Sequence, residues 1–225
     1  MIKRLRHFSI ACLFAMGTVG LAPGATILSI TGPLASSSGL GMTNFNSAQS
    51  AAGEAFALAT GFTNLSIIVS LGVFEDEPVP LTAWVTNKIG PGTTAANVIA
   101  TTTGTPLTSG PYTAFSGLSL GPGTYYLVLA AVQQFNNVGW DWTETQTVTT
   151  APGVTFLGQF ANPGNTNDSW NVLPPSYGDF GSLQFDNPFL TQISGDPAAV
   201  PEPQTIALTG MGMVVLLFRR SRRVS

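Results

Sequence analysis

Hydrophobic and polar residues alternate along much of this chain of 225 residues. In the segment TNLSIIVSLGV, the residues Leu65, Ile67, Val69, Leu71 and Val73 share one face, while two serines and a glycine lie on the other. This period of two residues is typical of a half-buried β-strand. The segment TYYLVLAAV is apolar on both faces, which indicates a strand in the middle of a sheet.

Further segments have the same character, and Pro-Gly pairs separate several of them. Proline followed by glycine favours a type II turn, and such pairs begin at Pro91, Pro122, Pro152 and Pro163. The remaining predicted strands are residues 26–31, 54–60, 81–87, 97–102, 145–150, 154–160 and 182–185. The best helical candidate, NSAQSAAGEAFALA, has a glycine in its middle, which disfavours a helix.

These patterns predict an all-β fold, namely one antiparallel β-sandwich of a jelly-roll-like kind in residues 26–195. Composition agrees, because 44% of the residues are hydrophobic and only 8% are charged. The residues expected in the core are Leu65, Ile67, Val69, Val85, Leu127 and Leu129.

Residues 1–25 have the form of a secretory signal peptide. Three basic residues among the first six precede an uncharged, mostly apolar run over residues 8–21, and small residues follow. Such a run is short for a membrane span and fits a signal sequence. We expect signal peptidase to cleave after Gly24 or Ala25, which removes the only cysteine, Cys12. The alternative is a buried amphipathic helix in a cytosolic protein.

Charge is distributed unevenly along the chain. Seven of the eight Lys and Arg residues lie in the first six or the last seven positions. Between Thr26 and Val200 there are ten acidic residues and one lysine, Lys88, which gives a net charge of −9. A body of this charge does not attract nucleic acid or an anionic membrane.

The chain finishes with an apolar segment, residues 205–218, and a cluster of arginines. As a helix, the fourteen residues of this segment would span roughly 21 Å, against about 30 Å of hydrocarbon. Arginines just beyond an apolar segment hold that end in the cytoplasm, so the body lies outside. Pro201 and Pro203 keep the backbone before the segment extended.

The order of a Pro-Glu-Pro motif, a short apolar helix and an arginine cluster resembles the PEP-CTERM sorting signal. The resemblance covers residues 200–223, about a tenth of the chain. It implies that an exosortase in the membrane cuts near the motif and passes the protein to the cell surface or extracellular matrix of a bacterium. The membrane is then only a transient partner. The sorting residues would be Pro201, Glu202, Pro203, Arg219, Arg220, Arg222 and Arg223.

Two further interpretations accompany this resemblance. A tail-anchored protein that keeps its apolar segment is the alternative to sorting. The body is similar, in its Gly-Pro-Gly loops and its GTYYLVL strand, to the choice-of-anchor domains, which are sandwich modules that precede such tails. This second resemblance implies the fold and no established activity.

The composition of the body excludes most catalytic chemistries. Between the two terminal segments there is no His, Cys or Arg, which excludes a His-based triad, a Cys nucleophile and a His-ligated zinc site. Nucleotide-binding glycine loops are absent as well, so no cofactor is expected. A glycosidase could use Asp141 with Glu144, or Asp168 with Asp179. Exposed acids solubilise any secreted domain, however, and we expect no enzyme activity.

The loop NPGNTNDSWN is a weak candidate for a calcium site. Asn162, Asn165, Asn167 and Asp168 offer oxygen ligands there, but the spacing is not that of an EF-hand. Asparagines in loops usually stabilise turns instead.

The segment GWDWTET is a candidate glycan-binding site. In a strand, Trp140 and Trp142 would share one face about 7 Å apart, with Asp141 on the other. Two exposed indoles would form a stacking platform for sugar rings. The alternative is that both rings fill the core, where tryptophans are mostly found.

Two classes of function therefore remain for the exported body. The first is a structural protein of the surface or matrix without small-molecule chemistry. The second is a carbohydrate-binding module for extracellular polysaccharide.

Overall fold

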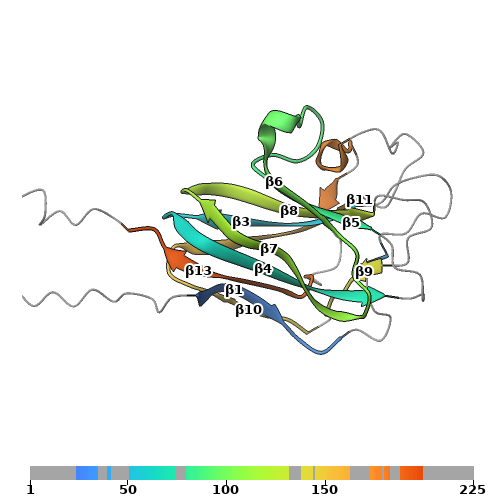
Figure 1. Cartoon of the computed structure of the whole chain (residues 1–225), viewed down its shortest axis with the longest axis horizontal. Helices are drawn as coiled ribbons and strands as arrows, with labels where there is room; N and C mark the ends of the chain where they lie inside the picture. Colours follow the sequence, from blue (N-terminus) through green and yellow to red (C-terminus); the bar gives the residue numbers. More distant parts are fainter. Residues whose placement is uncertain are drawn as a thin grey trace, which may run out of the picture.

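The computed structural model describes residues 24–34, 40–41, 51–73, 80–131, 138–143, 145–162, 173–178, 180–182 and 188–199. These residues form strands and two short 3-10 helices, η1 (Ala95–Asn97) and η2 (Pro174–Ser176). The strands make two antiparallel sheets that lie one above the other (Figure 1). In the described part of the chain, no helix is long and apolar enough to cross a membrane.

The first sheet, here called sheet A, is the lower one in Figure 1. In spatial order its strands are β10 (Thr147–Thr150), β1 (Ala25–Thr31), β13 (Thr191–Pro197), β4 (Phe62–Val73), β9 (Val138–Trp140) and β2 (Leu40–Gly41). The strand β7 (Gly110–Leu120) pairs with β4 as well. Since β13 pairs with both β1 and β4, it joins the two halves of this sheet.

The second sheet, sheet B, covers the inner face of sheet A. In spatial order its strands are β12 (Gly181–Ser182), β11 (Val154–Asn162), β3 (Ala51–Leu58), β8 (Gly123–Ala131), β5 (Leu81–Thr86) and β6 (Val98–Gly104). The chain passes from sheet A to sheet B through the predicted turn at Pro152-Gly153. Gly153 has φ +79°, and the amide of Val154 donates to the Ala151 carbonyl at 3.0 Å.

The two sheets enclose one apolar core. All six residues expected there are at most 1% exposed, so that prediction is confirmed. Alternation places one face of β4 and one face of β8 inward, and burying these side chains drives the sheets together. The prediction of an all-β, antiparallel, sandwich-like fold is therefore confirmed.

A second apolar cluster lies on the outer face of sheet B. Val128 and Ala130 of β8 pack there with Trp84 of β5 and with Tyr177, which follows η2. Figure 1 shows η1 and η2 above this sheet. This cover explains why β8 is apolar on both faces, as the sequence indicates.

Among the described strands of seven or more residues, β7 and β13 were not predicted from the sequence. In β7 the alternation of inward and outward residues is interrupted. Its pairing with β4 shifts register three times, and Gly117 has φ +73°. In β13, only Ile193 among the inward residues Thr191, Ile193 and Gly195 is a large apolar side chain. Of the strand predicted over residues 182–185, only Ser182 lies in the described part of the chain, and it belongs to β12.

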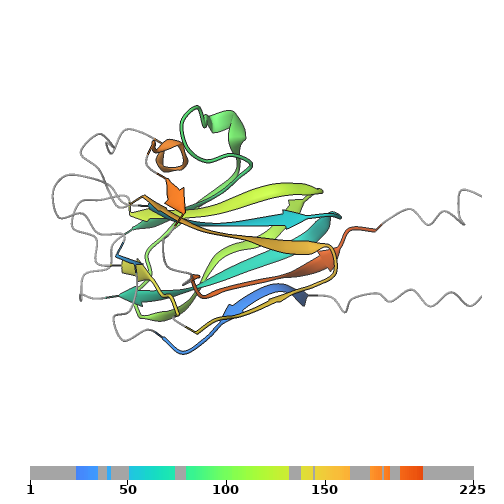
Figure 2. The same ribbon diagram turned by 180° about the vertical axis from the view of Figure 1, so that it is seen from behind.

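The first and last strands of the fold begin and end side by side. Ala25 pairs with Gly195, and Figures 1 and 2 show the start of β1 and the end of β13 at the same end of the sheets. The Asp196 carboxylate accepts hydrogen bonds from the Asn64 side chain at 2.8 Å and from the Gly24 amide at 2.6 Å. These bonds lower the pKa of Asp196 below its usual range, because they favour the charged form.

We expect Gly195→Ala to destabilise the protein. A Cβ atom on Gly195 would lie 2.6 Å from a methyl carbon of Leu65 and 3.1 Å from the Thr63 carbonyl oxygen. Leu65 is fully buried, so relieving this overlap should cost about 1–3 kcal/mol of unfolding free energy in a urea titration. Gly121→Ala is the control, because its Cβ would have no neighbour within 4 Å. Equal stability of the two variants would contradict the close packing of β13 against β4.

Candidate functional site

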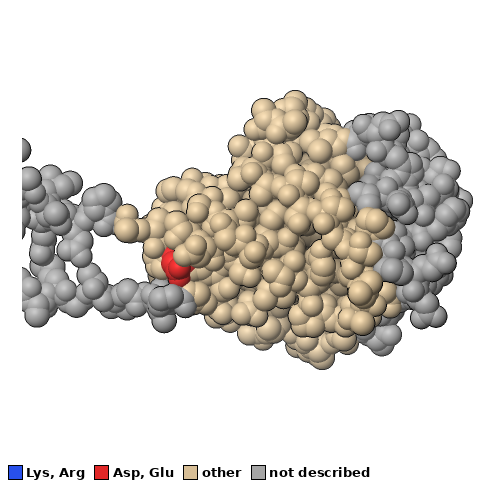
Figure 3. Space-filling view, in the orientation of Figure 1, with Lys and Arg blue, Asp and Glu red and all other residues tan. Residues whose placement is uncertain are grey.

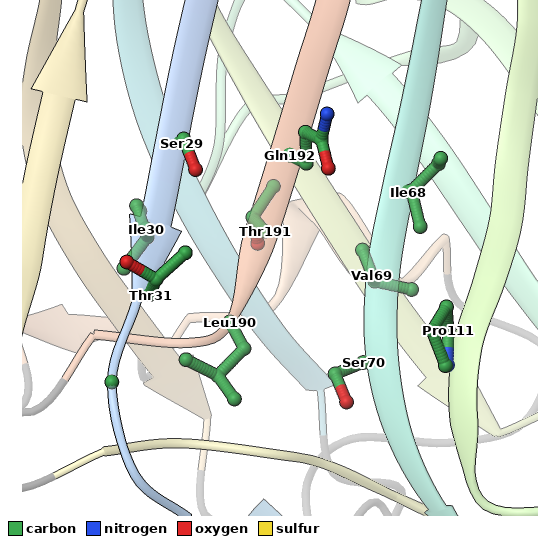
Figure 4. Close-up of a pocket in the computed structure, with 11 residues that line it drawn as sticks. Ser29, Ile30, Thr31, Ile68, Val69, Ser70, Pro111, Leu190, Thr191 and Gln192 are labelled. Atoms are coloured by element: carbon green, nitrogen blue, oxygen red, sulfur yellow. The ribbon is translucent and has the colours of Figure 1, made fainter. Parts of the chain in front are cut away.

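The outer face of sheet A contains a groove with a volume of about 260 Å³. It crosses β1, β13 and β4, which lie side by side, and reaches the start of β7 (Figure 4). Because side chains alternate along each strand, the residues between the core positions point outward here. The groove therefore arises from four segments that are far apart in the sequence.

The lining of the groove combines polar and apolar side chains without charge. Its polar members include Ser29 and Thr31 of β1, Ser70 of β4 and Gln192 of β13. Ile68, Pro111 and Leu190 supply much of the apolar surface. Small-molecule sites share this mixture of apolar surface and a few polar groups, but the volume here is below their usual range of about 300–1,000 Å³.

Asp141 lies at one end of the groove, between two of its lining residues. Its amide donates to the Ser70 carbonyl at 2.9 Å, and its own carbonyl accepts from the Leu190 amide at 2.8 Å. The hydroxyl of Ser70 donates to Oδ2 of Asp141 at 2.7 Å. The Oδ1 atom is buried and has no hydrogen-bond partner. The carboxylate thus fixes the direction in which the Ser70 hydroxyl points.

The groove lies at the opposite end of the sandwich from Asp196. Thr31 is the last residue of β1 and Thr191 the first of β13, whereas Gly24 and Asp196 lie at the other ends of these strands. The six residue steps along β1 correspond to about 20 Å. The far edge of the groove at Thr31 is therefore well separated from the chain ends of the fold, whereas Gln192 reaches back to the Thr26 hydroxyl.

A second, open depression of about 590 Å³ lies beside the loop after β5. Asn87, Lys88, Asn97 and Tyr125 line it. The Lys88 ammonium donates to the Gly92 carbonyl at 3.1 Å, and the Asn97 amide donates to the side chain of Asn87 at 2.9 Å. Several polar groups of this depression are thus already paired within the protein.

The described surface carries very little charge. Four described residues have acidic or basic side chains, namely Glu54, Lys88, Asp141 and Asp196, and Glu54 and Asp141 are buried. Figure 3 accordingly shows one small acidic area and no basic area on the visible described face. A surface of this kind attracts ligands through contact rather than through long-range electrostatics.

The expected platform of two exposed indoles is wrong for Trp140. Its side chain is 0% exposed, stacks on Phe189 with ring centroids 4.6 Å apart, and donates from Nε1 to the Leu190 carbonyl. Trp142 is half-buried, packs against the same core and forms a β-bridge with Phe189. Trp140 therefore lies in the core, as the alternative interpretation has it, and neither face of its ring is free for a sugar.

Several sequence-predicted residues lie outside the described part of the chain. These are the sorting residues Pro201, Glu202, Pro203, Arg219, Arg220, Arg222 and Arg223, the calcium candidates Asn165, Asn167 and Asp168, and the acids Glu144 and Asp179. Within the described ranges, no three His, Cys, Asp or Glu side chains come together to hold a metal ion. Of the proposed glycosidase acids, only Asp141 is described, and it is 3% exposed.

Glu54 is an unexpected acid in the middle of the core. It points from β3 into the space between the sheets and is 1% exposed. Burial raises its pKa from 4.5 to about 8, because the charged form loses its hydration. The Thr191 hydroxyl and the Phe189 backbone lie near enough to favour the charged form, but neither carboxyl oxygen has a partner within hydrogen-bond geometry. Desolvation therefore dominates, and Glu54 is protonated at neutral pH.

Sequence reasoning missed the groove, and only the alternation within each strand could have suggested its outward residues. No single segment carries a motif for it. In comparisons with protein-family models, with curated proteins and with solved structures, nothing matches this chain. The arrangement of residues is therefore the basis for any functional conclusion.

Trp140→Ala should destabilise the protein by about 3–5 kcal/mol, because it empties a fully buried site. Urea unfolding monitored by circular dichroism measures this loss. Leu107→Ala is the control, since Leu107 is 72% exposed and its truncation should change stability by less than about 0.5 kcal/mol. Unchanged stability of the Trp140 variant, together with lost polysaccharide binding, would restore the platform hypothesis.

Glu54→Gln should flatten the dependence of stability on pH. The unfolded chain releases the Glu54 proton near pH 4.5 and the folded protein only near pH 8. Between these values, each pH unit lowers the unfolding free energy of the natural protein by about 1.4 kcal/mol through this group. The variant has no carboxyl group at this position, so its unfolding free energy should not fall with pH in this way. At pH 8 it should be more stable than the natural protein.

Urea titrations at several pH values from 5 to 8 test this expectation. Asp196→Asn is the control, because the Asp196 pKa lies below its usual range and its titration affects stability only in acid. A Glu54→Gln variant that keeps the slope of the natural protein would show that Glu54 is ionised in the fold.

Proposed function

We propose that this chain is an exported, non-enzymatic protein of a bacterial cell surface or extracellular matrix. In this proposal signal peptidase removes residues 1–25 and an exosortase processes the PEP-CTERM tail. The observation that carries the proposal is the position of the two ends of the fold. Residues 24–25 and 195–197 lie together, so the segments before and after them are attached to the same end of the domain.

This arrangement suits processing at both ends. The amino-terminal segment precedes β1 and the sorting tail follows β13, so neither cut removes a core strand. Cleavage after Gly24 removes an amide donor from Asp196, but it creates an ammonium group on Ala25, which pairs with Gly195 beside that carboxylate. A nearby cation favours the charged carboxylate as the amide does.

The arrangement also suits display. Attachment through the chain that follows β13 would leave the opposite end, toward which the groove extends, away from the attachment. The core between the two sheets supplies the burial that stabilises a displayed domain. The finer assignments, a jelly-roll-like sandwich and a choice-of-anchor domain, belong to the same proposal.

The second candidate function is a carbohydrate-binding module. The Trp140 platform no longer supports it, but the uncharged groove with hydroxyl and amide groups does. The two candidates are compatible, since a displayed module can also hold extracellular polysaccharide. A carboxylate-based glycosidase is not favoured, because Asp141 is buried and already bonded to Ser70.

The mass of the surface form tests the proposed sorting. In a host that has an exosortase, the recovered protein should begin at Ala25 or Thr26 and should lack the arginine cluster. Glu202→Ala should abolish the cut, because it removes the central residue of the motif. Ala199→Ser, three residues earlier in the chain, is the control and should be processed normally. An intact mass that includes the arginines would instead identify a tail-anchored protein.

A further inference from the structure

The hydroxyl of Ser70 presents only an acceptor to the groove. A serine hydroxyl has one hydrogen and two lone pairs. In Ser70 the hydrogen is directed to Oδ2 of Asp141 at 2.7 Å. The Oδ2 atom of Asp141 is the acceptor of this bond, so the Ser70 hydrogen is already used within the protein. A ligand in the groove must therefore donate a hydrogen bond to Ser70.

The side chain of Gln192 also offers a hydrogen-bond acceptor to the groove. Its side-chain nitrogen donates to the Thr26 hydroxyl at 3.3 Å, and Figure 4 shows its oxygen on the side nearer Thr191. Ser29 and Thr31, across β13 from Ser70, have hydroxyls that both donate and accept. The groove thus offers a fixed acceptor at Ser70, an amide at Gln192 that can accept and still donate one hydrogen, and adaptable hydroxyls, and this pattern suits a ligand with many hydroxyl groups.

Charge is not part of this recognition. The side chains that line the groove are all uncharged. Among the described residues, Asp141 is the acid bonded to the lining, and its Oδ1 atom is buried, where a ligand cation cannot reach it. Ile68, Pro111 and Leu190 offer apolar surface for the C–H faces of a sugar ring.

From these features we propose that the groove binds a neutral, hydroxyl-rich ligand, specifically a segment of uncharged polysaccharide. Ser70 and Gln192 accept hydrogen bonds from its hydroxyl groups, and Asp141 is a positioning residue that sets the Ser70 hydroxyl. The proposal rests on the second candidate function, carbohydrate binding, and does not depend on exosortase sorting.

Titration calorimetry with the full chain in mild detergent tests the proposal. The probes are neutral oligomers of glucose, mannose and galactose, with oligogalacturonate as the anionic counterpart and oligomers of glucosamine as the cationic one. We expect at least one neutral oligomer to bind, and to bind more tightly than both charged oligomers. The measurement uses no processing step, so failed sorting in cells would leave its result unaffected.

Variants then locate the binding site. Ser70→Ala and Gln192→Ala should each weaken binding of the neutral oligomer by about 3- to 10-fold, the usual effect of one lost hydrogen bond. Ser66→Ala is the matched control, because Ser66 lies on the same face of β4 but outside the groove lining, and it should bind normally. Gln192 is exposed, so its variant should fold even if Ser70→Ala does not.

Asp141→Asn tests the positioning role separately. An asparagine amide can donate to Ser70, which frees the Ser70 hydrogen to point into the groove. Binding should weaken while circular dichroism keeps its β-sheet spectrum.

Three results would overturn the proposal. The first is that none of the neutral oligomers binds, and the second is that a charged oligomer binds more tightly than they do. The third is that neutral binding survives both groove substitutions but is lost in Lys88→Gln, which would move the site to the depression near Lys88.

Discussion

The pairing of β13 with both β1 and β4 is the interaction on which the rest of the structure depends. Without it, β10 and β1 would have no bonded connection to the remaining strands of sheet A. The same strand presents Thr191 to the buried Glu54 and Gln192 to the groove, and Leu190, which also lines the groove, directly precedes it. The strand also carries Asp196, which holds the start of β1. One strand therefore links the core, the groove and the chain ends.

The strands with large apolar side chains on their inward face could be predicted from the sequence, and β13 could not. In β4 every inward residue from Leu65 to Leu71 is Leu, Ile or Val, so the period is visible. In β13 the inward position of Gly195 must be small because the Leu65 side chain already fills that space. A strand that fits around a neighbour's side chain loses its own hydrophobic pattern. Its assignment needs the tertiary structure.

The functional residues were less predictable than the fold. The alternation at Trp140 and Asp141 was correct, since one side chain faces the core and the other bonds to Ser70 on the outer face. Exposure of Trp140 was wrong, and its polar neighbours Asp141 and Thr143 are themselves buried and have hydrogen-bond partners. Buried polar groups with partners are common in folded proteins, and sequence alone does not reveal the partner.

The described surface carries little charge, which limits how this part of the domain can recognise a ligand. Charged surfaces steer ligands over about a Debye length, but the described surface has only Lys88 and Asp196 for this purpose. Recognition must then arise at contact, from shape and from the direction of hydrogen bonds. Directed hydrogen bonds require a rigid frame, and the groove has one, because its residues lie on paired strands or beside them. The bond between Asp141 and Ser70 extends that frame to a hydroxyl hydrogen, which would otherwise rotate freely. The carboxyl group of Asp141 therefore acts on a neighbouring hydroxyl inside the protein, while the described lining of the groove is uncharged.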